Sequence, residues 1–197
     1  MKLKDLHFGN YLVLALLPLV WFSGGCGGNY ERENIMLDSL DAMLVKTAEY
    51  IDIDILTIQA RKKEIDQNYG LIKTYYTDTV SLEMGSNMQK YKGVLKVYNL
   101  FLNEVTHCKQ EMLELKKQVD NLRHDVNKGE MEKPEFRKFY DAEKLDNEIN
   151  LQLAERIGKT TMEVEPEYQR LSKYVGTIMT DMRNKNPEVE QILKSNK

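Results

Sequence analysis

The stretch that decides the fold runs from residue 86 to residue 128 and reads SNMQKYKGVLKVYNLFLNEVTHCKQEMLELKKQVDNLRHDVNK. Its larger apolar residues recur at short, regular intervals: Tyr91, Leu95, Tyr98, Leu102, Val105, Met112, Leu115, Val119, Leu122 and Val126. This is the period of an amphipathic helix. We therefore predict one helix over residues 86–128, about 64 Å long at a rise of 1.5 Å per residue. Ser86 and Gln89 match a capping box at its start, and Gly129 follows its end.

The same period occurs upstream of that stretch. It is carried by Leu37, Leu40, Leu44, Thr47, Ile51, Ile55, Ile58 and Ile65. We predict a helix over residues 30–68, capped by Asn29 and weakened at Tyr69-Gly70. Residues 71–85 contain β-formers, but a single strand has no partner for its backbone groups. We therefore expect a partly helical connection there.

A third helix is predicted downstream, where Pro134 suits a first helical turn. Its stripe comprises Phe136, Phe139, Leu145, Ile149, Leu153, Ile157, Val164, Tyr168, Leu171, Val175, Ile178 and Met182. Pro166 removes a backbone donor and crowds the residue four positions earlier, so we expect a kink or a short break between residues 158 and 166. A last short helix is expected from Asn186-Pro187-Glu188 to Leu193.

Helices this long cannot form a spherical domain, so their apolar stripes must pack against one another lengthwise. The short connection after Lys128 predicts that the helices on either side of it are antiparallel. The expected fold is all-α, an elongated antiparallel three-helix bundle or coiled coil over residues 30–185. Residues 186–197 form a short C-terminal helix or tail.

The composition excludes several classes of protein. The 197 residues include 28 Lys and Arg against 31 Asp and Glu, a net charge of −3, whereas nucleic-acid binders normally have a basic excess. Two cysteines are too few for a small disulfide-stabilised scaffold. With 4 Pro and 11 Gly, the chain is neither collagen-like nor of low complexity.

The N-terminal segment has the features of a secretory signal peptide. Lys2 and Lys4 precede an uncharged apolar run of 12 residues, Tyr11 to Phe22. A membrane-spanning helix needs about 20 such residues, so the run fits the apolar core of a signal peptide. Small residues follow it and lead to Cys26.

The sequence Ser23-Gly24-Gly25-Cys26 resembles a lipobox, the recognition sequence of bacterial lipoprotein signal peptides. Ser23 stands where the usual pattern has Leu, as in the relaxed lipoboxes of Bacteroidota, and the mature chain is similar to uncharacterised coiled-coil lipoproteins of that group. The resemblance implies that residues 1–25 are removed, that Cys26 carries the lipid and that residues 26–29 form a tether. It also implies an outer-membrane location facing the periplasm. An ordinary signal peptide and an uncleaved anchor are the other interpretations.

Two clusters suggest chemistry, and we expect a structural role for both. Glu104, His107 and Glu111 share a helix face beside Cys108 and could hold a metal ion, but a solvated face with Cys108 packed near the core is expected. Asp52-Ile53-Asp54 is similar to the start of a calcium loop but lacks its Gly and its last Glu. We expect no catalytic residue, metal site or cofactor.

These observations lead to two hypotheses about function. The first is a non-enzymatic, lipid-anchored helical scaffold of the bacterial cell envelope that presents its faces to a protein partner. The second is a small periplasmic module that binds a ligand or an envelope fragment. Candidate lining comes from Tyr75, Tyr76, Tyr91 and Tyr98, although core packing is the expected role of the last two. A scaffold is expected to lack a pocket of ligand size, roughly 300 Å³ or more.

Overall fold

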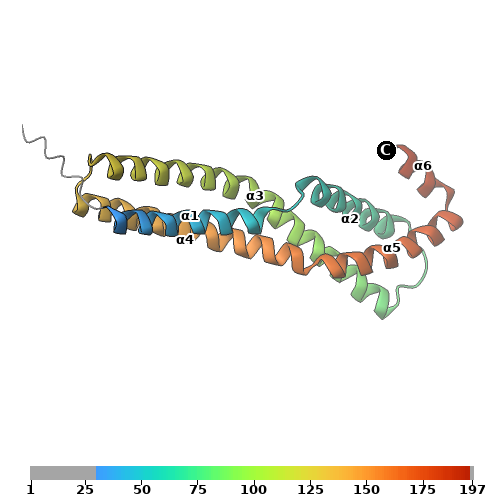
Figure 1. Cartoon of the computed structure of the whole chain (residues 1–197). Coiled ribbons are helices and arrows are strands. Elements are labelled where there is room, and N and C mark those ends of the chain that lie inside the picture. The colour runs from blue at the N-terminus through green and yellow to red at the C-terminus, as the bar shows by residue number, and fades with distance from the viewer. Residues whose placement is uncertain (1–29, 196–197) are drawn as a thin grey trace, which may run out of the picture.

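The computed structural model describes residues 30–195, and every regular element in this range is a helix (Figure 1). The elements in order are α1 (Glu31–Ile51), α2 (Ile55–Tyr75), α3 (Leu82–Lys128), α4 (Lys133–Glu163), α5 (Glu165–Lys185) and α6 (Pro187–Ser195). The predicted all-α class is therefore confirmed. The predicted cap, Asn29, lies outside the described residues.

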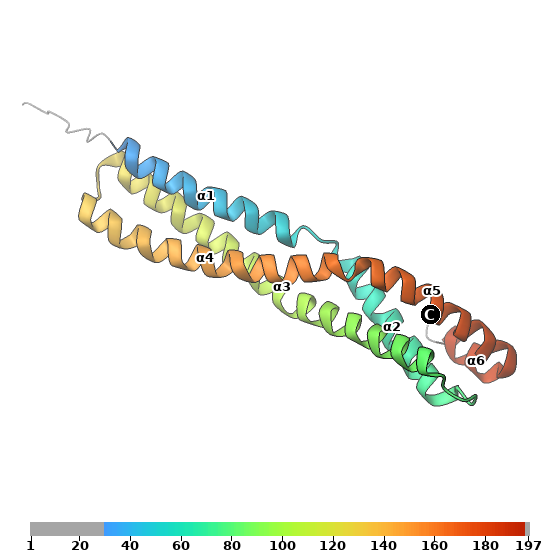
Figure 2. The ribbon, with the colours of Figure 1, turned by 90° about the horizontal axis from the view of Figure 1, so that it is seen from below.

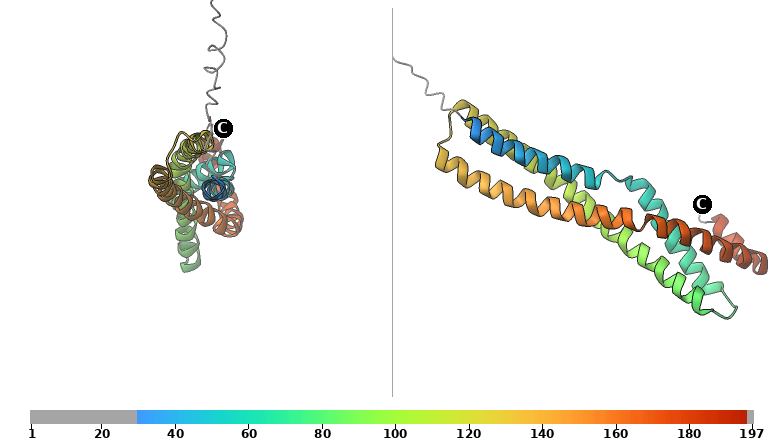
Figure 3. Two further views of the ribbon diagram at one scale, coloured as in Figure 1. Left: turned by 60° about the vertical axis from the view of Figure 1, so that its left-hand side comes forward. Right: turned by 60° about the horizontal axis from the view of Figure 1, so that its bottom comes forward.

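The helices form a long rod around α3. This helix has 47 residues and is bent, with a contour length of about 70 Å. Toward one end α1, α3 and α4 pack against one another in pairs, and toward the other end α2, α3 and α5 do the same (Figure 2). The start of α1 and the α3–α4 turn share one end of the rod (Figure 3). The α2–α3 loop and α6 lie at the far end.

The predicted single helix over residues 30–68 is wrong, because α1 and α2 are separated at Asp52–Asp54. The Asp54 carboxylate accepts hydrogen bonds from the Leu56 N–H group at 3.0 Å and from the Thr57 hydroxyl. It is the N-cap of α2, and the hydrogen bond from Thr57 lowers the pKa of Asp54. An Asp at an N-cap begins a new helix, so the apolar period alone could not reveal the break.

Residues 71–85 are partly helical, as predicted, but the ends of the two helices lie at other residues than expected. The helix is not interrupted at Gly70 and continues to Tyr75, so residues 71–75 are helical. The cap of α3 is Ser81, whose hydroxyl accepts from the Met84 N–H group at 3.1 Å. Ser86 and Gln89 lie inside α3, so the predicted capping box is wrong. Ser81 and Ser86 are both of a residue type that caps helices, but Ser81 is the one that directly precedes the first helical turn.

The predicted turn between α3 and α4 is confirmed. Gly129 has the left-handed φ of 69° that favours glycine, and its N–H group bonds the carbonyl groups of the last helical turn. Pro134 lies in the first turn of α4. Further along, α4 and α5 follow each other with only Val164 between them, and Pro166 lies in the first turn of α5.

Two apolar cores lie along the rod. One joins α1, the second half of α3 and the start of α4, and includes Leu37, Leu40, Leu115, Val119 and Phe136. The other joins α2, the first half of α3 and α5, and includes Ile58, Ile65, Tyr91, Tyr98 and Leu171. Met112 packs against both cores. Because α3 contributes to both, it connects the two halves of the rod.

The predicted core face of α4 is partly wrong. Leu145 and Ile149 are both 57% exposed, whereas Asn147 and Asn150 are buried. The buried positions follow one another at spacings of three, four or seven residues, at Phe136, Tyr140, Asn147, Asn150, Ala154, Ile157 and Thr161. This row contains polar and small residues, so a search for large aliphatic residues selected the opposite face of the helix.

Candidate functional site

The predicted lipid attachment residue, Cys26, lies outside the described residues and stays a prediction. Within residues 30–195, none of the helices combines the length and the apolar character needed to cross a bilayer.

Cys108 is buried, as predicted. The main chain of α3 is joined to a side chain of α4 there, because the side-chain amide of Asn150 donates to the Cys108 carbonyl at 3.2 Å. Burial, and then the nearby Glu111 carboxylate, raise the pKa of the Cys108 thiol to about 11. The thiol is therefore protonated at neutral pH and a poor nucleophile or metal ligand. His107 is exposed on the same helix, and this region does not bring three ligand atoms together.

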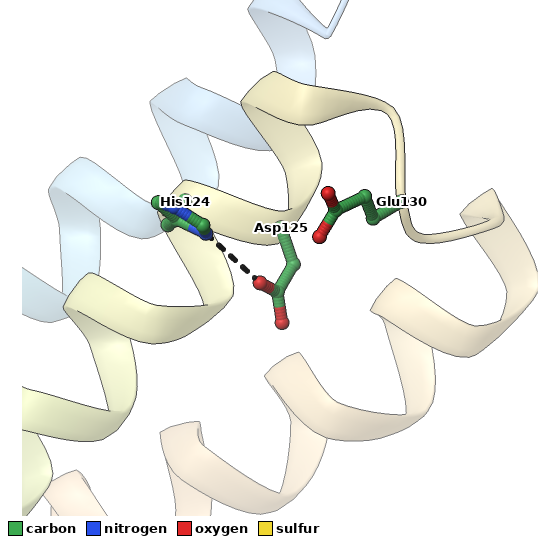
Figure 4. A group of neighbouring side chains, drawn as sticks. All are labelled: His124, Asp125 and Glu130. Carbon is green, nitrogen blue, oxygen red and sulfur yellow. Dashed lines mark hydrogen bonds and ion pairs between the residues drawn. The ribbon is translucent and has the colours of Figure 1, made fainter.

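A different group of ligand atoms meets at the end of α3. His124, Asp125 and Glu130 each offer one ligand atom within 4.8 Å of the others (Figure 4). The His124 Nδ1 atom lies 3.1 Å from an Asp125 carboxylate oxygen. Sequence spacing did not suggest this group, because the left-handed turn at Gly129 brings Glu130 back toward α3. All three side chains are in contact with solvent, and surface carboxylates often gather without a bound ion.

A partly buried polar network joins α2, α3 and α5 around Glu64. Tyr168 and Ser172 donate to its carboxylate at 2.8 and 2.7 Å, and Tyr91 donates at 3.4 Å. Burial raises the pKa of Tyr168 and of Tyr91, and the charge of Glu64 raises both further. Both hydroxyls therefore remain hydrogen-bond donors at neutral pH, and the network holds α2 against its neighbours.

An ion pair extends this network by one helical turn. Arg61 bonds Glu165, and the Arg61 guanidinium carbon lies 4.8 Å from the centre of the Tyr168 ring. Tyr98 packs edge-on against Tyr168 with 5.9 Å between ring centroids. Burial, and then Glu165, raise the pKa of Tyr98 to about 12. These protonated phenols and paired charges are suited to fixing helices rather than to proton transfer.

The four tyrosines named as candidate pocket lining are divided between two environments. Tyr91 and Tyr98 are fully buried in the core, so they line no ligand pocket. Tyr75 and Tyr76 border a pocket of about 160 Å³ near the far end, beside the ion pair between Lys185 and Asp78 at 2.6 Å. That volume is below the usual size of a ligand site.

Two open grooves have more than three times the volume of this pocket. One, of about 520 Å³, lies between α1 and α3 and is bordered by Val45, Ile51, Met112 and Leu113. The other, of about 680 Å³, lies between α2 and α3 near the far end. Both exceed the roughly 300 Å³ of a small ligand site, contrary to the expectation for a plain scaffold. Both are open to solvent along the helices.

The chain shows no significant match to a protein-family model, to a curated protein or to a solved structure.

Proposed function

We propose that this chain is a non-enzymatic scaffold or interaction protein of the bacterial cell envelope, anchored by lipid on Cys26 and facing the periplasm from the outer membrane. In this proposal the molecule is an elongated antiparallel three-helix bundle. The first long segment of the bundle comprises α1 and α2, the second is α3, and the third comprises α4 and α5. The third segment is kinked near Pro166. It uses no cofactor, binds no nucleic acid, and works through a protein partner.

The observation that supports this proposal is the position of the start of α1. It is fixed to the α3–α4 turn, since the Asn34 amide donates to the Asn127 side chain at 2.9 Å. The Lys133 ammonium adds a contact with Glu33 at 3.7 Å and lies 5.8 Å from the centre of the Tyr30 ring. The described part of the chain therefore begins at the end of the rod where the α3–α4 turn lies.

An anchor at Cys26 would then set the orientation of the rod. The four residue-to-residue steps from Cys26 to Tyr30 can extend over roughly 14 Å at most. The α3–α4 turn would lie close to the membrane, and α3 would carry the α2–α3 loop away from it by as much as about 70 Å. A spacer that presents a distant tip is the function this geometry supports best.

The lipid attachment is tested by growing cells with radiolabelled palmitate. We expect label in the native chain and in Cys108→Ala, and none in Cys26→Ala, because only Cys26 lies at the end of a lipobox-like sequence. The Cys108→Ala variant controls for acylation of an internal thiol. Label in the Cys26→Ala protein would show that the anchor assignment is wrong.

The second candidate function is a small module that binds a periplasmic ligand or an envelope fragment. The groove between α1 and α3 favours it, because Val45 and Leu113 expose 58% and 66% of their surface there. The test compares NMR line broadening of muropeptide fragments with the native chain and with Ala48→Trp, which blocks this groove. Equal broadening with both proteins would remove the groove from consideration.

A further inference from the structure

The first four turns of α3 and the facing side of α2 form an open groove of about 680 Å³, which we name the α2–α3 groove. Its lining includes Tyr69, Gly85, Met88, Lys92, Gly93 and Lys96. It lies near the far end of the rod, away from the start of α1. No contact described above for the core or for the Glu64 network uses its polar side chains.

The α2–α3 groove is basic. Lys92 and Lys96 lie one turn apart and are exposed, and neither forms an ion pair with a carboxylate in the described part of the chain. The Lys92 ammonium lies 5.5 Å from the centre of the Tyr69 ring, which holds it at the groove. Residues 55–100 carry seven basic and four acidic residues, although the whole chain has a net charge of −3. The charge complementary to this groove is negative.

The floor of the groove is unusually open because it contains two glycines. A Cβ atom on Gly93 would meet nothing within 4 Å, and one on Gly85 would meet only a Val80 methyl group at 4.0 Å. Packing within the chain therefore does not require glycine, which costs about 1 kcal/mol relative to Ala inside a helix. Without these side chains, a second backbone can approach α3 closely.

Two apolar side chains lie close to Gly85 in the groove lining: a Cβ atom on Gly85 would lie 4.0 Å from a Val80 methyl group, and Leu82 precedes Gly85 by three residues in α3. Val80 is 58% exposed and Leu82 is 96% exposed. A small free anion would make no favourable contact with these two apolar side chains. An amphipathic helix could place an apolar residue on them while its acidic residues face the lysines, as helices do in other recognition grooves.

We propose that the α2–α3 groove binds an α-helix of a partner protein, with carboxylates of that helix on Lys92 and Lys96 and an apolar side chain on Val80 and Leu82. The inference rests on the proposed role as an interaction protein and names the kind of partner. It does not depend on the lipid, so it is tested separately from the palmitate experiment.

The test uses the purified full chain in detergent micelles and three fluorescent helical peptides of about 20 residues, long enough to be helical. The peptides share one apolar face and carry Glu, Gln or Lys at the polar positions. Fluorescence anisotropy is expected to show at least tenfold tighter binding of the Glu peptide than of the Gln peptide. This preference should disappear at high salt, because screening weakens exposed charge pairs.

Variants show whether the binding occurs at this groove. The double variant Lys92→Glu/Lys96→Glu should prefer the Lys peptide, and Gly93→Leu should weaken Glu-peptide binding at least tenfold with unchanged helical circular dichroism. The matched controls are Lys117→Glu/Lys173→Glu, which changes the net charge equally, and Gly176→Leu, another open helical position. Equal binding of the Glu and Gln peptides, or equal losses in the controls, would overturn the proposal.

Discussion

Individual glycines have opposite effects in this molecule, depending on what surrounds them. A Cβ atom on Gly158 would lie 2.9 Å from the Tyr50 carbonyl carbon and closer still to its oxygen, so α4 touches the backbone of α1 there. Gly176, on α5, faces open space. Residue 158 begins the range in which we predicted a kink or a short break, whereas the structure shows that Gly158 allows two helices to approach closely.

This contrast predicts opposite effects of the same substitution. Gly158→Ala should lower the free energy of unfolding by about 2–3 kcal/mol, because the new methyl group clashes with backbone that cannot move alone. Gly176→Ala should raise it by about 0.5–1 kcal/mol, because Ala is the better helix former. Urea denaturation of both variants measures these changes. A neutral Gly158→Ala would show that the helices are not in close contact.

A second residue-scale prediction concerns pH. Burial, and then the Asp146 charge, raise the pKa of Glu143, and one of its carboxylate oxygens is buried without a hydrogen bond. Its ionisation therefore opposes folding, and the stability it confers when protonated is lost as pH rises through the raised pKa. Glu143→Gln should stabilise the protein at pH 7 by less than about 1 kcal/mol, since partial exposure screens the charge.

The gain from Glu143→Gln should vanish in acid, where the native carboxyl group is itself protonated. Urea unfolding at pH 7 and near pH 4 separates these cases. Glu148→Gln, which removes the surface contact with Lys144 at 3.6 Å, is the control and should bring no gain at pH 7. A gain that persists unchanged in acid would contradict the assignment to ionisation.

At the scale of elements, the start of α3 offers a direct test of its cap. Ser81→Ala should cost about 1 kcal/mol, because the Met84 N–H group loses the acceptor it bonds at 3.1 Å. Ser86→Ala, inside the same helix, should be neutral or slightly stabilising. Thermal unfolding followed by circular dichroism measures both. If Ser86→Ala lowered the stability more than Ser81→Ala, the helix would begin at Ser86, as predicted from the sequence.

The sequence predicted long-range periodicity better than local interruptions. The apolar repeat correctly indicated an all-helical chain, the long helix ending at Gly129 and a buried Cys108. It missed the break at Asp52–Asp54, because a single side chain that caps a helix leaves the repeat unchanged. It also chose the wrong face of α4, where Asn147 and Asn150 occupy buried positions and Leu145 does not.

The functional features were harder to predict because they depend on distant contacts. Glu64 bonds residues of α3 and α5 that lie 27 to 108 positions away in sequence. The His124 group needs the left-handed turn at Gly129 to bring Glu130 close. The α2–α3 groove is open partly because Gly85 and Gly93 have no side chains. A single sequence does not show whether a glycine in a helix faces a neighbouring element or open space.

For the whole molecule, the proposed anchor predicts which end lies at the membrane. Glu130→Cys and Thr79→Cys place single labelling sites at the two ends of the rod. The raised pKa of Cys108 and its burial keep the native thiol unlabelled at neutral pH. In liposomes with acceptor-labelled lipids, energy transfer should be strong from residue 130 and weak from residue 79. Equal transfer from both would mean that the rod lies flat.

The break at Asp52–Asp54 also determines how the molecule would respond to mechanical load. If the N-terminal end is held and a partner pulls on the far tip, the shortest covalent path between them is α1, this break and α2. Both helices lie alongside α3 over their lengths, so tension acts as shear along the rod and many side-chain contacts must slip together. Asp52–Asp54 is the part of that path that lies outside the helices. It is therefore the segment that would lengthen first, and it would give the rod a compliant joint between two stiff halves.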